Sequence, residues 1–557
     1  MPETSSLYNA RLLAKVLKAH GCKHLVVSPG SRNAPLIYAC TAEQFETYSV
    51  PDERSAAFTA MGMALEKGEP AAVICTSGSA AANFLPAVTE AYFQKVPLIV
   101  ITADRPKEWQ NQGAGQTIIQ EGIYGKHILG EANLIREPQD ELSKAYNLRI
   151  CQEALLHINK GPVHINVPFD EPLYDKYQGP EESFRIIKRP STKRFLAEED
   201  FNQLKDIFHN AQRPAILVGQ MPPRPRLHSA LKKLMEKSPF LLLSETLSNL
   251  ADLPGIHSID RFLNTLNKEE KAQFKPDLLI SLGGEVVSKM IKVHFQQSEP
   301  FPQWHFTEDE AFKDTFHKLS LNLDCDATWF FEKLAEEAEG ETNSWVDECM
   351  SLEIHKRKAH SQYIAEVPYS DFKIFGRILE HLPDHSIFHC ANSASIRYAQ
   401  LFDHKEGILH YANRGTSGID GSTSTAIGHA LTTNKPVTLV SGDIAFMYDN
   451  AAFWNDRLPE NLKVIVINNS GGNIFRIIKG PDQIEGFERF QETTHNLKLQ
   501  ALAELYGIQY FNAEDDSSTQ GALKELYAFK GLAILEIKSP RLESPEALSN
   551  YWAYLKS

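Results

Sequence analysis

The sequence contains little cysteine. Seven cysteines are scattered among 557 residues, their number is odd, and no two of them form a C-x-x-C pair. A disulfide framework needs paired cysteines and a structural zinc site needs closely spaced ligands, so the pattern argues against both. Reduced thiols are typical of the cytoplasm, and we expect the protein to be cytoplasmic.

Basic residues and long apolar runs are also scarce. Lys and Arg total 57 against 71 Asp and Glu, which gives a net charge of −14. A chain this acidic lacks the broad basic surface that binds phosphate backbones, so we expect no nucleic-acid partner. The longest apolar runs, such as Pro97–Ala103, are far shorter than a bilayer span, so we expect no membrane segment.

The chain does contain a repeated alternation of short apolar runs with longer amphipathic stretches. This pattern is typical of buried parallel strands alternating with helices. A segment rich in proline and charge, near 169–195, interrupts the alternation. A second interruption, 338–369, has a helical pattern, and we expect it to connect two domains over the surface. We therefore predict three doubly wound α/β domains with parallel sheets, over residues 1–180, 195–337 and 365–557.

Two strand ends in the third domain carry residues suited to a metal ion. One predicted strand ends at Gly442-Asp443, and the next ends at Asn468-Asn469 before a turn at Gly471. The carboxyl ends of neighbouring parallel strands face one crevice. The Asp443 carboxylate, the Asn469 amide oxygen and the Gly471 carbonyl are hard ligands that suit Mg²⁺, with Mn²⁺ as an alternative. Taken separately, each half is also explained as an ordinary turn or helix cap.

Together the two halves resemble the metal and diphosphate motif of thiamine diphosphate enzymes. That family usually has a second glycine where this chain has Ile444. The resemblance implies thiamine diphosphate as cofactor, and pyrimidine-binding, central and diphosphate-binding domains in that order. It also implies a glutamate that hydrogen-bonds the aminopyrimidine ring and promotes loss of the C2 proton. Glu53 matches that glutamate, although alone it is also explained as a first-turn acid favoured by the helix dipole.

Other segments match the same family. The stretch TSGSAAANF, residues 76–84, resembles the turn on the pyrimidine side of the cofactor in that family, and it is also explained as the capped start of a helix. The resemblance assigns cofactor binding to Glu53, Ser79, Asn83, Arg414, Ile419, Gly442, Asp443, Asn469 and Gly471. In the family the glutamate of one subunit faces the diphosphate site of another. We therefore expect a homodimer or tetramer with active sites at the subunit interface.

Basic residues also gather at the ends of predicted strands, where active sites form in such folds. They are Arg32, Arg105, Lys289, Arg397 and Arg414. Several cations around one small site indicate a polyanionic substrate. Each arginine alone is also explained as a solvated charge or an ion pair.

Four motifs narrow the resemblance to the 2-succinyl-5-enolpyruvyl-6-hydroxy-3-cyclohexene-1-carboxylate (SEPHCHC) synthases: SPGSRNAPL, DERSAAF, NRGTSGIDG and NNSGGNIF. This implies a transferase of menaquinone biosynthesis, which decarboxylates 2-oxoglutarate and adds the succinyl carbanion equivalent to isochorismate. The resemblance assigns catalysis to Glu53, Arg32, Gln116 and Ser393. It assigns substrate binding to Ser31, Arg32, Arg105, Gln116, Lys289, Ser393, Arg397, Ile474 and Phe475.

Two alternatives remain open at this point. An acetolactate synthase-like enzyme or a 2-oxoacid decarboxylase would share the cofactor but would need fewer cations and a more apolar pocket. A non-catalytic nucleotide-binding regulator would share only the fold, and the joint presence of Glu53 with Asp443 and Asn469 counts against it. The chain also departs from the family at Lys289-Met290, where two basic residues are frequent, and Lys292 is a candidate substitute.

Overall fold

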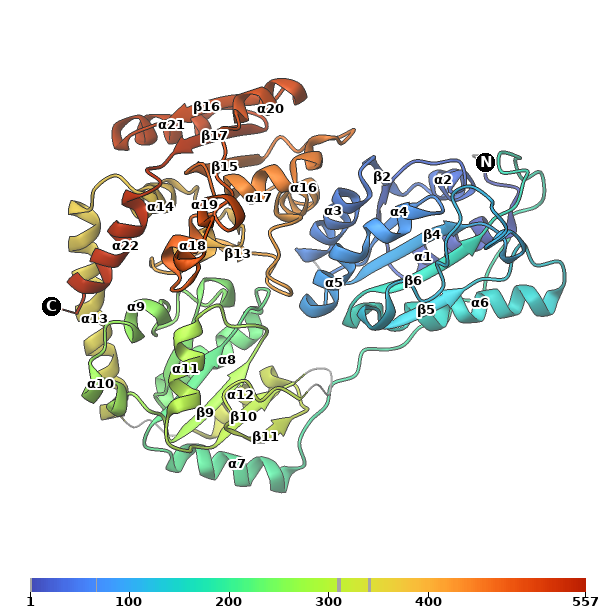
Figure 1. Ribbon diagram of the computed structural model, residues 1–557. Helices are drawn as coiled ribbons and strands as arrows, with labels where there is room; N and C mark the ends of the chain where they lie inside the picture. Colours follow the sequence, from blue (N-terminus) through green and yellow to red (C-terminus); the bar gives the residue numbers. More distant parts are fainter. Residues whose placement is uncertain (1–2, 67, 308–311, 339–341, 557) are drawn as a thin grey trace.

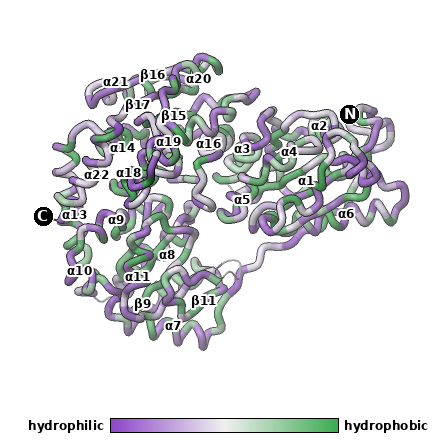
Figure 2. Tube along the Cα trace, viewed as in Figure 1, coloured by the Kyte–Doolittle hydropathy of each residue, from purple (hydrophilic) through white to green (hydrophobic). Residues whose placement is uncertain are grey.

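The computed structural model describes residues 3–66, 68–307, 312–338 and 342–556. It contains three parallel β-sheets with helices on both faces, arranged as three successive bodies along the chain (Figure 1). The prediction of three doubly wound α/β domains is confirmed at the level of fold. Apolar residues follow the strands and the inner faces of the helices in each body, as Figure 2 shows. Their burial is the main source of stability in such a fold.

The N-terminal sheet has the strand order β2-β1-β3-β4-β6-β5. Its strands are β1 His24–Val27, β2 Glu46–Ser49, β3 Ala71–Cys75, β4 Leu98–Asp104, β5 Gly130–Asn133 and β6 Val163–Pro168. Its helices are α1 Tyr8–Ala19, α2 Ala34–Ala42, α3 Glu53–Leu65, α4 Ser79–Asn83, α5 Leu85–Gln94 and α6 Glu141–Leu155. An extended segment then runs from this body to the central one (Figure 1).

The central sheet has the order β11-β10-β9-β7-β8. Its strands are β7 Pro214–Val218, β8 Leu241–Ser244, β9 Leu278–Leu282, β10 Gln303–Phe306 and β11 Leu319–Leu323. Its helices are α7 Glu198–Asn210, α8 Pro225–Lys237, α9 Ile259–Leu263, α10 Lys268–Gln273, α11 Lys289–Gln297 and α12 Ala327–Glu337.

The C-terminal sheet has the order β13-β12-β14-β15-β17-β16. Its strands are β12 Ile387–Cys390, β13 Leu409–Tyr411, β14 Val437–Gly442, β15 Leu462–Asn468, β16 Gln509–Ala513 and β17 Ala533–Lys538. The helices before and around it are α13 Ser344–Glu366, α14 Asp371–His381, α15 Ala394–Ala399, α16 Ser422–Thr432, α17 Asp443–Tyr448, α18 Ile474–Ile477, α19 Phe487–Phe490, α20 Leu499–Tyr506, α21 Asp516–Ala528 and α22 Glu543–Tyr554.

The expectation that 338–369 is a surface connection is wrong in one respect. Helix α13 buries Glu353, whose carboxylate accepts hydrogen bonds from Arg261 of the central domain at 2.5 Å and from Arg357 at 2.8 Å. Asp403 of the C-terminal domain also pairs with Arg261 at 2.9 Å. Paired burial of these charges avoids the cost of desolvating a lone ion. Helix α13 is therefore part of the junction between the central and C-terminal domains.

Helices α3 and α16 join the N-terminal and C-terminal domains (Figure 1). Two glycines permit their close approach. A Cβ atom at Gly62 would lie 2.1 Å from the Thr425 carbonyl oxygen, and one at Gly428 would lie 1.9 Å from the Thr59 carbonyl oxygen. Any larger side chain there would force the helices apart.

Within the described residues, no helix combines the length and the apolar character that crossing a membrane requires. All seven cysteines are buried free thiols.

Candidate active site

The residues predicted to hold a metal ion meet at one edge of the C-terminal sheet. Strands β14 and β15 are parallel neighbours, so their carboxyl ends lie side by side. Asp443 begins α17, and its Oδ2 accepts a hydrogen bond from the Gly471 N–H at 3.0 Å. Asp443 and Asn469 are both buried. Thus Asp443 and the turn of residues 469–473, called here the metal turn, form one small polar region.

The two asparagines after β15 have different environments. Both ends of the Asn468 amide are used: Nδ2 donates to Glu536 at 2.7 Å, and Oδ1 accepts from the Ser470 N–H at 2.9 Å. The Asn469 Nδ2 donates to Asp371 Oδ2 at 3.3 Å, but its buried Oδ1 has no hydrogen-bond partner within the described ranges. An unpaired buried amide oxygen is costly unless a ligand satisfies it. The donor set therefore fits a hard divalent cation, with Asn469 as its amide ligand.

Two further residues of this region escaped the sequence reasoning. His495 Nε2 lies 3.2 Å from Asp443 Oδ2, and its pKa is raised by the hydrogen bond to that carboxylate. Both amide atoms of Asn473 are buried and lack hydrogen-bond partners in the part of the chain that the structure describes. Asn473 lies inside the motif NNSGGNIF, so a buried polar residue between glycine and isoleucine was the available signal. His495 comes from a distant segment without a motif, and nothing local pointed to it.

Glu53 is the first residue of α3, where the Asp52 side chain accepts a hydrogen bond from the Ser55 N–H at 2.8 Å and caps the helix. Burial raises the pKa of the Glu53 carboxyl. A carboxyl group with a raised pKa is suited to proton exchange near neutral pH.

Ser79, Asn83 and Gln116 lie together on the outer surface of the N-terminal domain. All three are exposed, and a Cβ atom at Gly78 would lie 3.2 Å from the Gln116 Cα, which places the two loops in contact. Among the described residues, no hydrogen bond or ion pair joins these three side chains or Glu53 to Asp443 and the metal turn. We call these two groups, the candidate pyrimidine-side residues and the candidate diphosphate-side residues, the two half-sites.

Arg32 and Arg105 form a basic pair at the carboxyl ends of β1 and β4. Arg32 follows the exposed Ser31, is itself buried, and donates from Nη1 to the Phe169 carbonyl at 3.2 Å. Burial, and then the charge of Arg105, lower the pKa of Arg32. Arg105 donates from Nε to the Gly115 carbonyl at 3.0 Å. Arg32 Nη2 lies 3.8 Å from Glu171 Oε1, so this carboxylate already offsets part of the charge, and the mutual repulsion of the two cations favours a further anion near them.

Arg397 and Arg414 form a second basic group, at the junction of the C-terminal and central domains. Burial lowers the pKa of both guanidinium groups, and the Asp260 carboxylate opposes this effect at Arg397. Arg414 Nη1 donates to Asn392 Oδ1 at 3.0 Å. Ser393 adopts φ +72°, an uncommon value for a residue other than glycine, and such strain is frequent at functional sites.

Lys289 begins α11 and is exposed. The Glu245 carboxylate accepts hydrogen bonds from the N–H groups of residues 287 and 288, at 2.6 Å and 2.7 Å, and so fixes the start of this helix. Lys292 Nζ lies 3.7 Å from Glu285 Oε2. Lys292 thus already has an acidic partner, whereas Lys289 is held at a helix start beside the domain junction.

The apolar candidates follow the polar ones in sequence. Ile474 and Phe475 begin α18 directly after the metal turn, with Ile474 buried and Phe475 partly buried. Ile419 is partly buried in the loop 412–421, where Asn392 Nδ2 donates to the Gly418 carbonyl at 2.6 Å.

Glu90 of the N-terminal domain fixes the same loop. Its buried carboxylate accepts hydrogen bonds from the N–H groups of Gly415 and Thr416, each at 2.7 Å. Sequence reasoning missed Glu90 because its partners lie more than 300 residues away. Through this contact the N-terminal domain holds the loop that carries Arg414 and Ile419.

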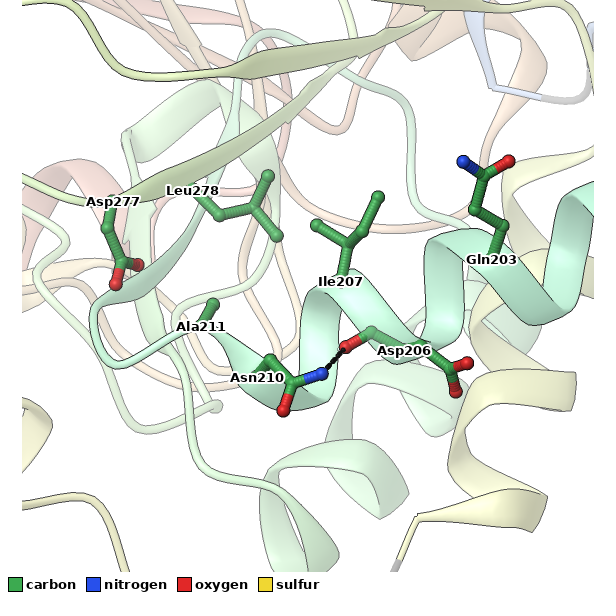
Figure 3. Close-up of a pocket in the computed structure, with 7 residues that line it drawn as sticks. All are labelled: Gln203, Asp206, Ile207, Asn210, Ala211, Asp277 and Leu278. Atoms are coloured by element: carbon green, nitrogen blue, oxygen red, sulfur yellow. Dashed lines mark hydrogen bonds between the residues drawn. The ribbon is translucent and has the colours of Figure 1, made fainter.

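A hollow of about 430 Å³ on the central domain lies apart from these residues (Figure 3). It is lined by α7 and the start of β9. Asp206 and Asp277 both line it, and both oxygens of Asp277 accept hydrogen bonds from backbone N–H groups of residues 212 and 213, at 2.8 Å and 2.9 Å. The Asp277 carboxylate is therefore engaged by the backbone, which does not favour a catalytic role for it in this hollow.

Two family models match the chain at the domains that carry the two half-sites. The thiamine pyrophosphate enzyme N-terminal TPP-binding domain matches residues 9–123, and the corresponding C-terminal TPP-binding domain matches residues 392–537. With the three-sheet fold and the polar metal turn, these matches define a thiamine pyrophosphate enzyme.

Relatives narrow the assignment further. The chain is 38% identical to the SEPHCHC synthases of Christiangramia forsetii, over 98% of this chain and 99% of that one, and of Flavobacterium johnsoniae, over 98% of each. It is 36% identical to that of Porphyromonas gingivalis, over 98% of this chain and 96% of that one. The chain belongs to the 2-succinyl-5-enolpyruvyl-6-hydroxy-3-cyclohexene-1-carboxylate synthase family.

Proposed function

We propose that this chain uses thiamine diphosphate to decarboxylate 2-oxoglutarate and to add the remaining succinyl unit to isochorismate in menaquinone biosynthesis. The observation that carries the proposal is identity of 36–38% over nearly the full length to synthases of this one name. The two basic groups support it independently, because both substrates are polyanions and buried carboxylates require cations. An acetolactate-type enzyme is disfavoured, since its small substrate would leave one group without a partner.

Thiamine diphosphate, when bound, supplies the carbon nucleophile that makes decarboxylation and carbon–carbon bond formation feasible. We infer that Asp443, Asn469 and the Gly471 carbonyl hold Mg²⁺, for which Mn²⁺ can substitute, and that this cation compensates the diphosphate charge. Gly442, Ser79, Asn83, Arg414 and Ile419 complete the proposed cofactor contacts.

Glu53 is assigned proton exchange with the aminopyrimidine ring nitrogen. Burial raises the pKa of Glu53, and this direction supports the role because it strengthens the carboxyl group's hold on a proton. Gln116 and Ser393 are assigned to the reacting centre as hydrogen-bonding groups, together with Arg32.

The basic side chains proposed to bind the substrates lie in two groups on different domains. Arg32, with Ser31, Arg105 and Gln116, would bind carboxylates on the N-terminal side. Arg397 and Lys289 would bind them at the junction of the central and C-terminal domains, with Ile474 and Phe475 as the apolar wall. A guanidinium group offers two parallel N–H donors to a carboxylate, which suits the arginines to this task.

The exposure of the N-terminal half-site supports an assembly of more than one copy. Exposed apolar residues lie close in sequence to Ser79, Asn83 and Gln116: Leu85 is 38% exposed, Trp109 49% and Ile119 63%. An apolar surface that carries cofactor-binding groups is best explained by a second copy covering it. We therefore propose a homodimer, or a tetramer built from it, in which each active site combines Glu53 of one copy with Asp443 of the other.

Two further assignments are part of this proposal. The domain boundaries 1–180, 195–337 and 365–557 remain predictions, and each range contains one of the three sheets. A cytoplasmic location is supported by the seven buried free thiols.

A direct assay tests the function. The purified protein should consume 2-oxoglutarate and isochorismate together, release CO₂ and require both thiamine diphosphate and a divalent cation. The acetolactate-type enzyme would be favoured instead if the protein preferred pyruvate to 2-oxoglutarate, or if it formed a coupled product without isochorismate.

A further inference from the structure

Asp371 is a buried carboxylate beside the metal turn that the proposed function does not use. It is the first residue of α14 and is 2% exposed. Its Oδ2 accepts a hydrogen bond from Asn469 Nδ2 at 3.3 Å, and its Oδ1 accepts one from the Ser539 hydroxyl. Asp371 thus contacts Asn469, whose amide oxygen is unpaired in the described ranges.

The surroundings hold the Asp371 carboxylate in place. The Asp371 N–H donates to Ser544 Oγ at 2.9 Å, and Ser544 Oγ lies 3.1 Å from Ser539 Oγ. The Ser539 N–H donates to the Asn468 carbonyl at 2.9 Å, which ties this group to the end of β15. A buried carboxylate with several fixed donors has little freedom to reorient.

This arrangement determines which end of the Asn469 amide faces the metal region. An ionised carboxylate only accepts hydrogen bonds, so it attracts Nδ2 and repels Oδ1. With Nδ2 directed to Asp371, Oδ1 is left as the unpaired atom on the other side. If the amide were reversed, two N–H groups would occupy that place, and an N–H group cannot bind a hard cation.

We propose that Asp371 is a positioning residue that orients Asn469 so that its oxygen, and not its nitrogen, faces the divalent cation. The proposal rests on the metal site of the proposed function. Residues that orient metal ligands commonly change metal affinity by about 10- to 100-fold when they are replaced. The charge of Asp371 also acts on Asp443, but its hydrogen bond to the amide acts through Asn469, and this gives the proposal a distinctive test.

The test is a double-mutant cycle read by metal binding without turnover. Mg²⁺ is titrated calorimetrically into protein with thiamine diphosphate and no substrate, and Mn²⁺ binding is followed by electron paramagnetic resonance. The variants are Asp371→Leu, Asn469→Ala and the double replacement, with melting temperatures measured for each. Asp516→Asn is the matched control. Asp516 pairs with Arg377, which lies on α14 as Asp371 does, so this replacement weakens an ion pair of the same helix. Asp516 itself does not contact Asn469.

We expect Asp371→Leu to weaken metal binding about tenfold, and the double variant to bind no more weakly than Asn469→Ala alone. Asp516→Asn should retain wild-type metal affinity even if it melts earlier. Wild-type metal affinity in Asp371→Leu, or strictly additive losses in the double variant, would overturn the proposal. Unchanged affinity in Asn469→Ala would instead overturn the metal-site assignment itself.

Two milder variants keep the test valid if Asp371→Leu does not fold. Asp371→Asn retains an acceptor for Asn469 at similar size, so it should lose less affinity than the leucine variant. The exchange Asp371→Asn with Asn469→Asp places a carboxylate at the metal and an amide donor behind it. Because both carboxylate oxygens can bind the cation, we expect this exchange to recover at least wild-type metal affinity. If the exchange variant bound the metal no more tightly than Asp371→Asn alone, the proposal would be contradicted.

Discussion

The two half-sites of this chain differ in how much of their environment one copy supplies. Around the metal turn, Asp443, Asn469 and Asp371 are buried and joined by hydrogen bonds within the C-terminal domain. On the N-terminal domain, Ser79 and Asn83 are exposed. The region proposed to hold the cation and diphosphate is therefore organised within one chain, whereas the proposed pyrimidine region is open to solvent. This contrast supports the proposal that the chain acts as an assembly.

The largest effect should come from the exposed half. Replacement of Glu53 by Gln keeps the size of the side chain but removes its ability to exchange a proton, so C2 proton exchange of bound thiamine diphosphate should slow about a thousandfold. Cofactor affinity should stay nearly unchanged. Proton exchange is followed by NMR in D₂O, and a wild-type rate would show that Glu53 is not the proton-exchanging group.

Replacements in the buried half-site around the metal turn should weaken the binding of metal and cofactor, and not only slow proton exchange. Asp443→Ala removes the charged ligand, so affinity for Mg²⁺ and for thiamine diphosphate should both fall about a hundredfold. Calorimetric titration of each component measures this, with Asp449→Asn as a buried carboxylate control. If cofactor binding were unaffected, the metal would have to lie elsewhere.

The two basic groups should affect substrates and spare the cofactor. Arg105→Ala or Arg397→Ala should raise the Michaelis constant for at least one substrate about tenfold, equivalent to about 1.4 kcal/mol for a lost charge-assisted contact. Lysine at either position should recover only part of this, because an ammonium group lacks the paired donors of guanidinium. Steady-state kinetics with each substrate varied in turn give the comparison. Wild-type constants in both alanine variants would contradict the polyanion argument.

The last expected effect concerns stability rather than activity. Burial raises the pKa of Glu245 to about 7, so its folded-state pKa lies above its unfolded value. Its contribution to stability is therefore fully present below about pH 4.5 and is lost as the pH rises through about 7, by at most about 3 kcal/mol. The melting temperature of wild type should fall more between pH 5 and pH 8 than that of Glu245→Gln. Parallel curves would show that Glu245 does not titrate in this range.

Much of the fold was predictable from sequence because interior strands are continuous apolar runs. Strands such as β3 and β17 are almost entirely buried and were expected from their composition. The strands that escaped include β5 and β16, which lie at sheet edges, have mostly partly or fully exposed residues and carry polar side chains. An edge strand is buried on fewer sides, so its sequence does not differ clearly from a loop.

The residues of the candidate site also divide into those that the sequence reveals and those that it does not. Asp443 and Asn469 could be found because each directly follows a recognisable strand. Asp371 and Glu90 could not, because each acts on a loop far away in sequence and resembles an ordinary helix residue when read alone. Only the folded arrangement reveals contacts of this kind.

The central claim is that each active site joins half-sites from two copies, and complementation tests it most directly. Glu53→Gln and Asp443→Ala chains, each inactive alone, are coexpressed with different affinity tags and the mixed dimer is isolated. One site of that dimer then contains wild-type Glu53 from one copy and wild-type Asp443 from the other, so the dimer should recover about half of wild-type synthase activity. A mixed dimer as inactive as either variant would contradict the claim.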